Sequence, residues 1–140
     1  MKTVFDSIFA VIGAILGFYF GELDGLLIIL CVFSVLDYLT GILSAIISKN
    51  LSSSIGFKGL LKKMLIFAFV GMANLLDVYI VGSGQVLRTA VIFFYLSNEG
   101  LSIVENAVEI GLPVPAALTG FLKKVNENAE KKEVETDENN

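Results

Sequence analysis

The 140-residue chain contains no histidine, no tryptophan and a single cysteine, Cys31. Without histidine, the chain lacks the commonest general base and the commonest metal ligand. One cysteine can form neither a disulfide nor a cysteine-based zinc site within the chain. Cys31 lies in an apolar run, where it is interpreted as a small hydrophobic residue. We therefore predict no enzyme activity, no metal site and no cofactor.

Charged residues are also scarce. They make up 17% of the chain, against about 25% in soluble domains. Hydrophobic residues make up 55%, and the mean hydropathy is +0.78. A soluble fold this small leaves much of its surface in water and could not bury so much apolar surface. The sequence therefore predicts a one-domain, all-α integral membrane protein in contact with lipid, and no basic patch invites nucleic acid.

Four segments are long and apolar enough, or nearly so, to cross a membrane as helices. Crossing takes about 20 apolar residues, with a lower limit of about 17. We place the helices at residues 4–20, 26–47, 64–81 and 86–110. The first is rather long for a signal peptide and the chain stays hydrophobic after it, so we expect it to remain in the membrane. The fourth is the least hydrophobic, and the alternative is three spans plus an interfacial helix.

The basic residues of the loops predict the orientation. The turns at residues 21–25 and 82–85 contain glycine but no Lys or Arg. The longer loop at residues 48–63 should face the cytoplasm, because cytoplasmic loops are enriched in Lys and Arg. With four spans, both termini are then cytoplasmic. The basic residues of this loop are Lys49, Lys58, Lys62 and Lys63.

The C-terminal part of the chain differs in composition. Pro113 and Pro115 cannot continue a helix, so the transmembrane domain is expected to cover residues 1–115. Residues 116–140 are predicted to be cytoplasmic, beginning with a short amphipathic helix at the lipid headgroups. From Asn126 onward we expect a disordered acidic tail, since six of the chain's 14 acidic residues lie there.

Glycine recurs in the first predicted helix at intervals of four, as Gly13, Gly17 and Gly21. Residues four apart share a helix face, and glycine there lets two backbones approach closely. Glycine is frequent in membrane helices generally, but three in register favour a packing face. The partner is either another helix of the chain or a second copy. Gly41, in the second helix, is a further candidate for packing or oligomerisation.

Two acidic residues, Asp37 and Glu99, lie near the middle of predicted spans. Counted at 1.5 Å per residue, Asp37 and Glu99 lie about 16 and 18 Å from the outer ends of their helices. A carboxylate at such a depth usually faces a bundle interior or water. If the two share a depth, one is protonated unless water reaches them. The plainer alternative for Asp37 is a protonated side chain that makes one interhelical hydrogen bond.

Asp77 and Arg88 flank the second glycine turn. We expect them to form an ion pair, which would lower the free energy of inserting both, and we assign this pair a structural role. The polar residues expected to line a pore or the bundle interior are Asp37, Ser44, Asn74, Asp77, Arg88, Asn98 and Glu99.

The order of several short motifs resembles a known family. The second helix carries Asp37-Tyr38-Leu39-Thr40-Gly41, and Asp77 follows in the third. The motif residues outside these helices are Ser53, Gly56, Gly59, Gly111, Pro113 and Pro115. Together they resemble the phage lysis and toxin-secretion holin family of Gram-positive bacteria and their phages. The resemblance covers roughly residues 26–124.

This resemblance implies a function that composition does not supply. Such holins accumulate in the host's cytoplasmic membrane, form homo-oligomers and open lesions that release an endolysin, or a large toxin in clostridial relatives. Membrane lipid and further copies of the chain are the implied partners. The endolysin or toxin would pass without stable binding, and an antiholin partner is left open. The alternative function is a small proton-coupled multidrug-type transporter in which a buried carboxylate exchanges protons; a non-conducting scaffold is a third.

Overall fold

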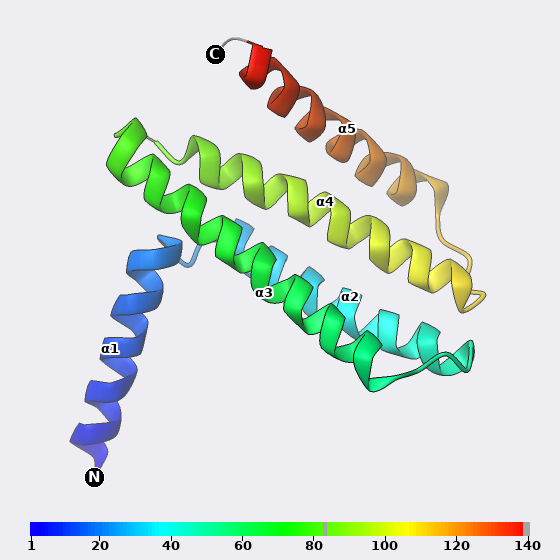
Figure 1. Ribbon diagram of the computed structural model, residues 1–140, viewed down its shortest axis with the longest axis horizontal. Helices are drawn as coiled ribbons and strands as arrows, with labels where there is room; N and C mark the ends of the chain where they lie inside the picture. Colours follow the sequence, from blue (N-terminus) through cyan, green and yellow to red (C-terminus); the bar gives the residue numbers. More distant parts are fainter. Residues whose placement is uncertain (83, 139–140) are drawn as a thin grey trace.

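The computed structural model describes the backbone of residues 1–82 and 84–138 and the side chains of residues 1–82, 84–128 and 131. The described backbone contains helices and turns but no strand (Figure 1). This confirms the predicted all-helical class. The elements are α1 (Lys2–Phe20), α2 (Gly25–Ile47), α3 (Ser53–Leu76), the π-helical turn η1 (Asp77–Val81), α4 (Val86–Glu109) and α5 (Ala116–Glu138).

Polar caps and glycine set the ends of the helices. The Asp24 carboxylate accepts a hydrogen bond from the Leu27 backbone N–H at 2.9 Å and so caps α2. Ser52 caps α3 in the same way through the Ile55 N–H at 3.3 Å. Gly82 ends η1 with a φ of 75°, a left-handed conformation that glycine adopts without steric hindrance.

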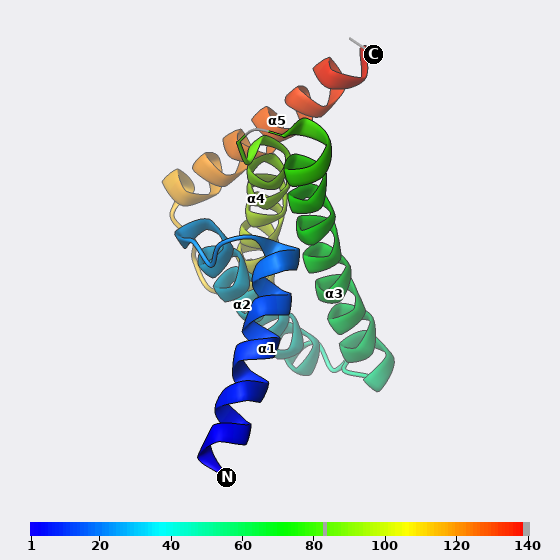
Figure 2. The same ribbon diagram turned by 90° about the vertical axis from the view of Figure 1, so that its left-hand side faces the viewer.

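Helices α2, α3 and α4 form the centre of the molecule (Figures 1 and 2). α2 and α4 run parallel, because their starts meet at Asp24 and Arg88 and their ends meet at Ser44 and Glu109. α3 runs in the opposite direction. In lipid, such helices are held by van der Waals packing and interhelical hydrogen bonds. The apolar core consists of Leu27, Leu30, Ile66, Val70 and Ile92.

Helix α1 projects from the bundle and has no buried residue (Figures 1 and 2). Its C-terminal end is fastened to α3. The Tyr19 hydroxyl donates to the Ala68 carbonyl at 2.8 Å, and the Asn74 amide donates to the Tyr19 carbonyl at 3.1 Å. Gly71 makes room for this contact, because a Cβ there would lie 1.9 Å from a Tyr19 ring carbon. The rest of α1 is free for contacts outside the chain.

Helix α5 folds back along α4 (Figure 1). Leu122 is buried against Gly100, where an added Cβ would lie 2.8 Å from the leucine side chain. The expected disorder from Asn126 onward is wrong for the described backbone, which stays helical to Glu138. The segment is rich in Ala, Glu and Lys, which favour helix. Most of the acidic side chains of this tail lie outside the described residues, as do residues 139 and 140.

The start of α3 and the number of spans differ from expectation. α3 begins at Ser53 instead of residue 64, since Ser52 caps it. Within the described chain, three helical segments are long and apolar enough to cross a membrane: Lys2–Phe20, Gly25–Ile47 and Ser53–Val81. The polar stripe of α4 lowers its hydropathy, so the predicted count of four spans is not confirmed.

Candidate functional site: polar clusters inside the bundle

Charged and polar side chains meet between α2, α3 and α4 in what we call the central cluster: Asp37, Lys63, Glu99 and Asn106. The Lys63 ammonium forms ion pairs with the carboxylates of Asp37 and Glu99. The exposed fractions of Asp37, Lys63 and Glu99 are 8%, 8% and 1%. The Asn106 amide donates to the Asp37 carboxylate at 3.3 Å and to the Thr40 hydroxyl at 3.0 Å. Every helix of the central bundle therefore contributes a polar group to one buried site.

Helical periodicity brings these residues together. Asp37 shares the buried face of α2 with Leu30 and Ser34. Lys63 precedes Ile66 and Val70 at steps of three and four, which places it on the buried face of α3. The expectation that Lys63 lies in a cytoplasmic loop is therefore wrong. The helix begins ten residues earlier, and Lys63 points into the bundle instead of toward water.

A second group, the hairpin-end cluster, lies beside the two glycine turns: Asp24, Asn74, Asp77 and Arg88. The Arg88 side chain is completely buried. Its guanidinium donates to the Asp24 carboxylate at 2.7 Å and to the backbone carbonyls of Phe20 and Glu22 at 2.7 and 2.8 Å. Asp24 lies in a turn outside the spans, and the hydrogen bond from Arg88 holds the pKa of this carboxyl below its usual value.

The predicted side-chain ion pair between Asp77 and Arg88 is not formed. Asp77 instead accepts hydrogen bonds from the backbone N–H groups of Leu87 and Arg88 at 3.1 and 2.8 Å. These donors stand at the start of α4, where backbone N–H groups lack partners within the helix and attract negative charge. Asp77 therefore caps α4, and the Arg88 guanidinium is left to bind Asp24.

The two clusters are separated by the apolar core and lie at different depths. Arg88 and Glu99 are about 16 Å apart along α4 at 1.5 Å per residue. A further ten residues, or about 15 Å, lead from Glu99 to Glu109, which accepts a hydrogen bond from Ser44. Polar contacts therefore occur at both ends of α4 and near its middle. The end-to-end distance matches the roughly 30 Å thickness of a bilayer's hydrocarbon core.

The remaining predicted site residues divide into buried and open positions. Gly41 packs on α4, since a Cβ there would lie 3.6 Å from the Asn106 amide nitrogen. Gly21 is the turn residue after α1, with a φ of 78°. Gly13 and Gly17 face open space, and Asn98 is half-buried. The exposed positions are Lys49, Lys58, Lys62, Ser53, Gly111, Pro113 and Pro115.

Two glycines of the resemblance motif, Gly56 and Gly59, face α2. Gly56 and Gly59 lie on the first two turns of α3, against the Tyr38 ring of α2. A Cβ at Gly59 would lie 3.4 Å from that ring, and one at Gly56 would lie 3.5 Å from the Tyr38 hydroxyl. Both distances are ordinary van der Waals contacts, so the two glycines pack on Tyr38 beside the central cluster, and this packing has room for a Cβ.

The sequence did not predict the buried position of Lys63 or the contact between Tyr19 and Gly71. The role of Lys63 was missed, although its spacing to Ile66 and Val70 was a usable signal. The Tyr19–Gly71 contact joins residues far apart in the sequence, and a single glycine in a membrane helix gave no sign of it. Within the described part of the chain, no group of three or more metal-ligating side chains occurs.

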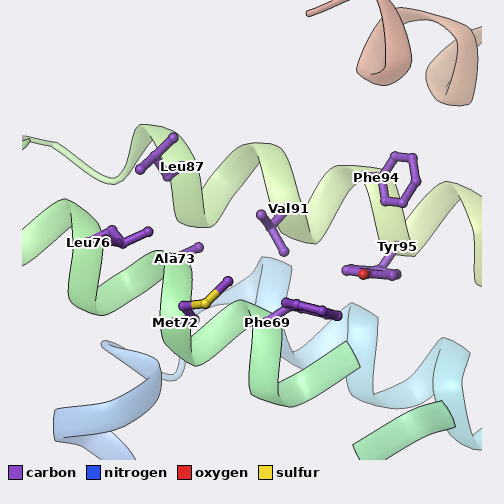
Figure 3. A pocket seen from close by; sticks show the side chains of 8 residues that line it. All are labelled: Phe69, Met72, Ala73, Leu76, Leu87, Val91, Phe94 and Tyr95. Atoms are coloured by element: carbon purple, nitrogen blue, oxygen red, sulfur yellow. The ribbon is translucent and has the colours of Figure 1, made fainter. Parts of the chain in front are cut away.

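An apolar groove runs between α3 and α4 near the hairpin end (Figure 3). It has a volume of about 370 Å³. Its lining contains no charged residue, which suits contact with lipid better than with a polar ligand. The groove is lined by Phe69, Met72, Ala73, Leu76, Leu87, Val91, Phe94 and Tyr95.

The sequence is similar to proteins of phages and Gram-positive bacteria. The family model of the bacteriophage holin family matches residues 14–127. A protein described as a probable holin, from Bacillus phage phi105, is 36% identical over 121 residues, covering 86% of this chain and 88% of the relative. An uncharacterized protein of Listeria monocytogenes is 46% identical over 110 residues, covering 79% and 78%. No solved structure matches the chain.

Proposed function

We propose, because the chain belongs to the bacteriophage holin family, that it is a holin of a bacterial cytoplasmic membrane. In this role it accumulates, oligomerises and opens lesions through which an endolysin, or a toxin, leaves the cytoplasm. The matched region includes α2, α3, α4 and part of α1 and α5. The compared proteins give no support to the transporter that the sequence left as an alternative.

The observation that carries this proposal is the polarity of the bundle. Its interior holds Asp37, Lys63 and Glu99 near the middle and Arg88 at the hairpin end, each buried. Its outside is apolar, with exposed leucine, isoleucine, valine and phenylalanine on α1, α2 and α3. Such a protein rests in lipid with its charges hidden. If the helices separate, the same polar faces can line water, as a lesion requires.

Contacts between copies would use helix α1. Gly13 and Gly17 have open space beside them, and α1 has no buried residue in the chain. Small residues four apart allow close packing of membrane helices. Gly41 already packs against Asn106 within the chain, so we assign Gly41 to folding and Gly13 and Gly17 to association.

The orientation follows from the exposed lysines. Lys49 and Lys58 lie at the end of the bundle where α2 leads into α3, and Lys62 lies about one turn further along α3. We place this end in the cytoplasm, because Lys and Arg are enriched there. The hairpin-end cluster then lies at the outer surface. If α4 also spans, both termini are cytoplasmic.

The packing of α5 on α4 conflicts with a membrane crossing by the whole of α4. Leu122 packs on Gly100, about 14 Å from the C-terminal end of α4 by helical rise. Lys123 and Lys124 are exposed beside it. Ammonium groups facing lipid at that depth are strongly unfavourable. We therefore propose that α4 completes its crossing only when α5 leaves Gly100 and moves to the cytoplasmic surface.

Induced expression in a bacterium tests the function. An endolysin without an export signal is co-expressed, and membrane potential, viable count and culture density are followed. A holin produces sudden depolarisation after a delay, and then lysis only when the endolysin is present. Continued growth with an intact potential, at verified membrane expression, would contradict the proposal. A culture that expresses the endolysin alone is the control.

A further inference from the structure

The central cluster has an unbalanced charge. With Asp37, Lys63 and Glu99 all ionised, two carboxylates face one ammonium, and the net charge is −1. Arg88 is bound at the hairpin end, about 16 Å away along α4. Lys62 on α3 and the two α5 lysines, Lys123 and Lys124, are exposed. An uncompensated buried charge is strongly unfavourable, and a carboxylate relieves it by taking up a proton.

The hydrogen bonds distinguish the two carboxylates. Asp37 has a donor on each oxygen, Lys63 on Oδ2 and Asn106 on Oδ1, which favours its ionised form. Among the described residues, hydrogen bonds to Glu99 come from Lys63 alone, at Oε2. Glu99 is also the more deeply buried, at 1% exposure against 8%. The proton therefore belongs on Glu99.

A hydroxyl without a partner lies at the same level. Ser34 is 3% exposed, and its Oγ is the one buried side-chain polar atom of the described residues that has no hydrogen bond. Contacts between α2 and α4 join residues 64 to 69 positions apart, as Asp24 meets Arg88, Ser44 meets Glu109 and Asp37 meets Asn106. These offsets place Ser34, on the buried face of α2, level with the stretch of α4 at residues 98–103, which includes Glu99.

We propose that Glu99 is a proton-binding site at the centre of the bundle. A proton from water forms an O–H bond on the Glu99 carboxylate, and a shift of the Glu99 side chain brings this new O–H to Ser34, whose hydroxyl has no hydrogen-bond partner among the described residues. Asp37 and Lys63 remain an ion pair, so the cluster becomes neutral. Loss of the proton returns a net negative charge to the interior and weakens the packing of α4 on α2 and α3.

The charged groups that face Glu99 are Asp37 from α2 and Lys63 from α3. From α5, Leu122 packs on Gly100 and the Asn126 side chain accepts a hydrogen bond from Ser97, and neither of these side chains titrates. The proton site does not depend on the lesion-forming role, so each can fail without the other.

Infrared spectroscopy of the full chain in lipid vesicles at neutral pH tests the proposal. The readout is the C=O stretching band of a protonated carboxyl, identified by its shift in D₂O. Wild type should show one such band, and Glu99→Gln should remove it. Asp37→Asn should remove it as well, because one carboxylate and one ammonium then balance. Ser34→Ala should keep the band but move it to higher frequency. Glu105→Gln, an exposed acid on the same helix, is the matched control and should change nothing.

Three outcomes would overturn the proposal. The first is a wild-type spectrum without a protonated carboxyl. The second is a protonated-carboxyl band that remains in Asp37→Asn. Glu99 would then be protonated because it is buried, and not because the charges of the cluster must balance. The third is a response of the carboxylate bands to replacement of sodium by a large organic cation, which would identify a metal cation as the ligand.

Discussion

The Arg88 guanidinium donates a hydrogen bond to the Asp24 carboxylate at 2.7 Å, and this contact fastens the start of α4 to the start of α2. Arg88 is completely buried, whereas the Asp24 side chain is 30% exposed. The backbone carbonyls of Phe20 and Glu22 accept further hydrogen bonds from the same guanidinium. The turn between α1 and α2 is therefore shaped by an arginine 64 positions after Asp24.

Replacement of Asp24 by Asn should lower the free energy of unfolding at pH 7 by about 1.5–3 kcal/mol, the usual contribution of a hydrogen bond to a charged group. Because Arg88 lowers the pKa of Asp24, the stabilisation is present at neutral pH and is lost as the pH falls through that lowered pKa. The stabilities of wild type and variant should therefore converge in strong acid. Thermal unfolding in detergent, followed by circular dichroism across this pH range, measures both effects.

Glu22→Gln is the control for this experiment, since Glu22 lies in the same turn and contributes only its backbone carbonyl to Arg88. Its unfolding curve should match that of wild type. A difference between wild type and Asp24→Asn that persisted in strong acid would show that the aspartate stabilises the turn by something other than its charge.

Replacement of Lys63 by Met should destabilise the bundle by about 3–5 kcal/mol, because it leaves the buried Asp37 carboxylate without its cation. Lys62→Met changes the neighbouring, exposed lysine of the same helix and should have an effect within about 0.5 kcal/mol. The triple variant Asp37→Asn, Lys63→Met, Glu99→Gln should recover much of the loss, since a neutral cluster avoids uncompensated charge. Unfolding by denaturant in micelles measures all three. Equal losses for Lys62→Met and Lys63→Met would contradict the buried triad.

The sequence predicted the elements of the fold better than their ends. Runs of apolar residues located α1 and α2 within one or two residues, because lipid-facing helices must be apolar along their length. The ends of α4 were located by the glycine turn before it and by the prolines that follow it. The start of α3 was missed, since its first turns carry Lys58 and Lys62 and resemble a loop by composition. Only the Ser52 cap indicated it. Hydropathy detects only the part of a helix that is apolar enough for lipid, whereas capping and backbone hydrogen bonds determine where the helix begins and ends.

The candidate site was predicted in part. Asp37 and Glu99 were recognised as a pair at similar depth, and both lie in the central cluster. Their shared partner Lys63 was not recognised, because the positive-inside rule uses only the number of Lys and Arg residues in a loop. It does not consider which face of a helix a lysine occupies. The predicted ion pair of Arg88 with Asp77 was wrong, because it relied on distance along the sequence. Asp77 was nearer in sequence, but its carboxylate satisfies the backbone at the start of α4.

Replacement of Gly71 by Ala should detach α1 from α3, because the new Cβ would lie 1.9 Å from a Tyr19 ring carbon. A pair of spin labels, one on α1 and one on α3, should report a longer and broader distance distribution. The double variant Gly71→Ala, Tyr19→Ala removes the clash but also the Tyr19 hydrogen bond to Ala68. It should therefore recover only part of the wild-type distribution.

Gly13→Ala is the matched control on α1, since nothing in the chain lies within 4 Å of a Cβ at that position. It should leave the distances within the chain unchanged. It should weaken cross-linking between copies if Gly13 and Gly17 mediate association. An unchanged distance distribution in Gly71→Ala would show that α1 is not held by the Tyr19 contact.

Replacement of Leu122 by Asp should release α5 from α4 and make lesions open earlier. Leu122 is 7% exposed and fills the space beside Gly100, whereas Leu118 on the same helix is 49% exposed. Leu118→Asp adds the same charge at an open position, so any change specific to Leu122→Asp reports the docking of α5 and not the charge of the helix. Onset of depolarisation after induction, at matched protein levels, measures the effect. If α5 restrains α4, Leu122→Asp precedes wild type while Leu118→Asp follows the wild-type time course. If depolarisation begins at the wild-type time in both variants, α4 reaches its final position with α5 still in place. The proposal that α4 completes its membrane crossing only when α5 leaves Gly100 is then wrong.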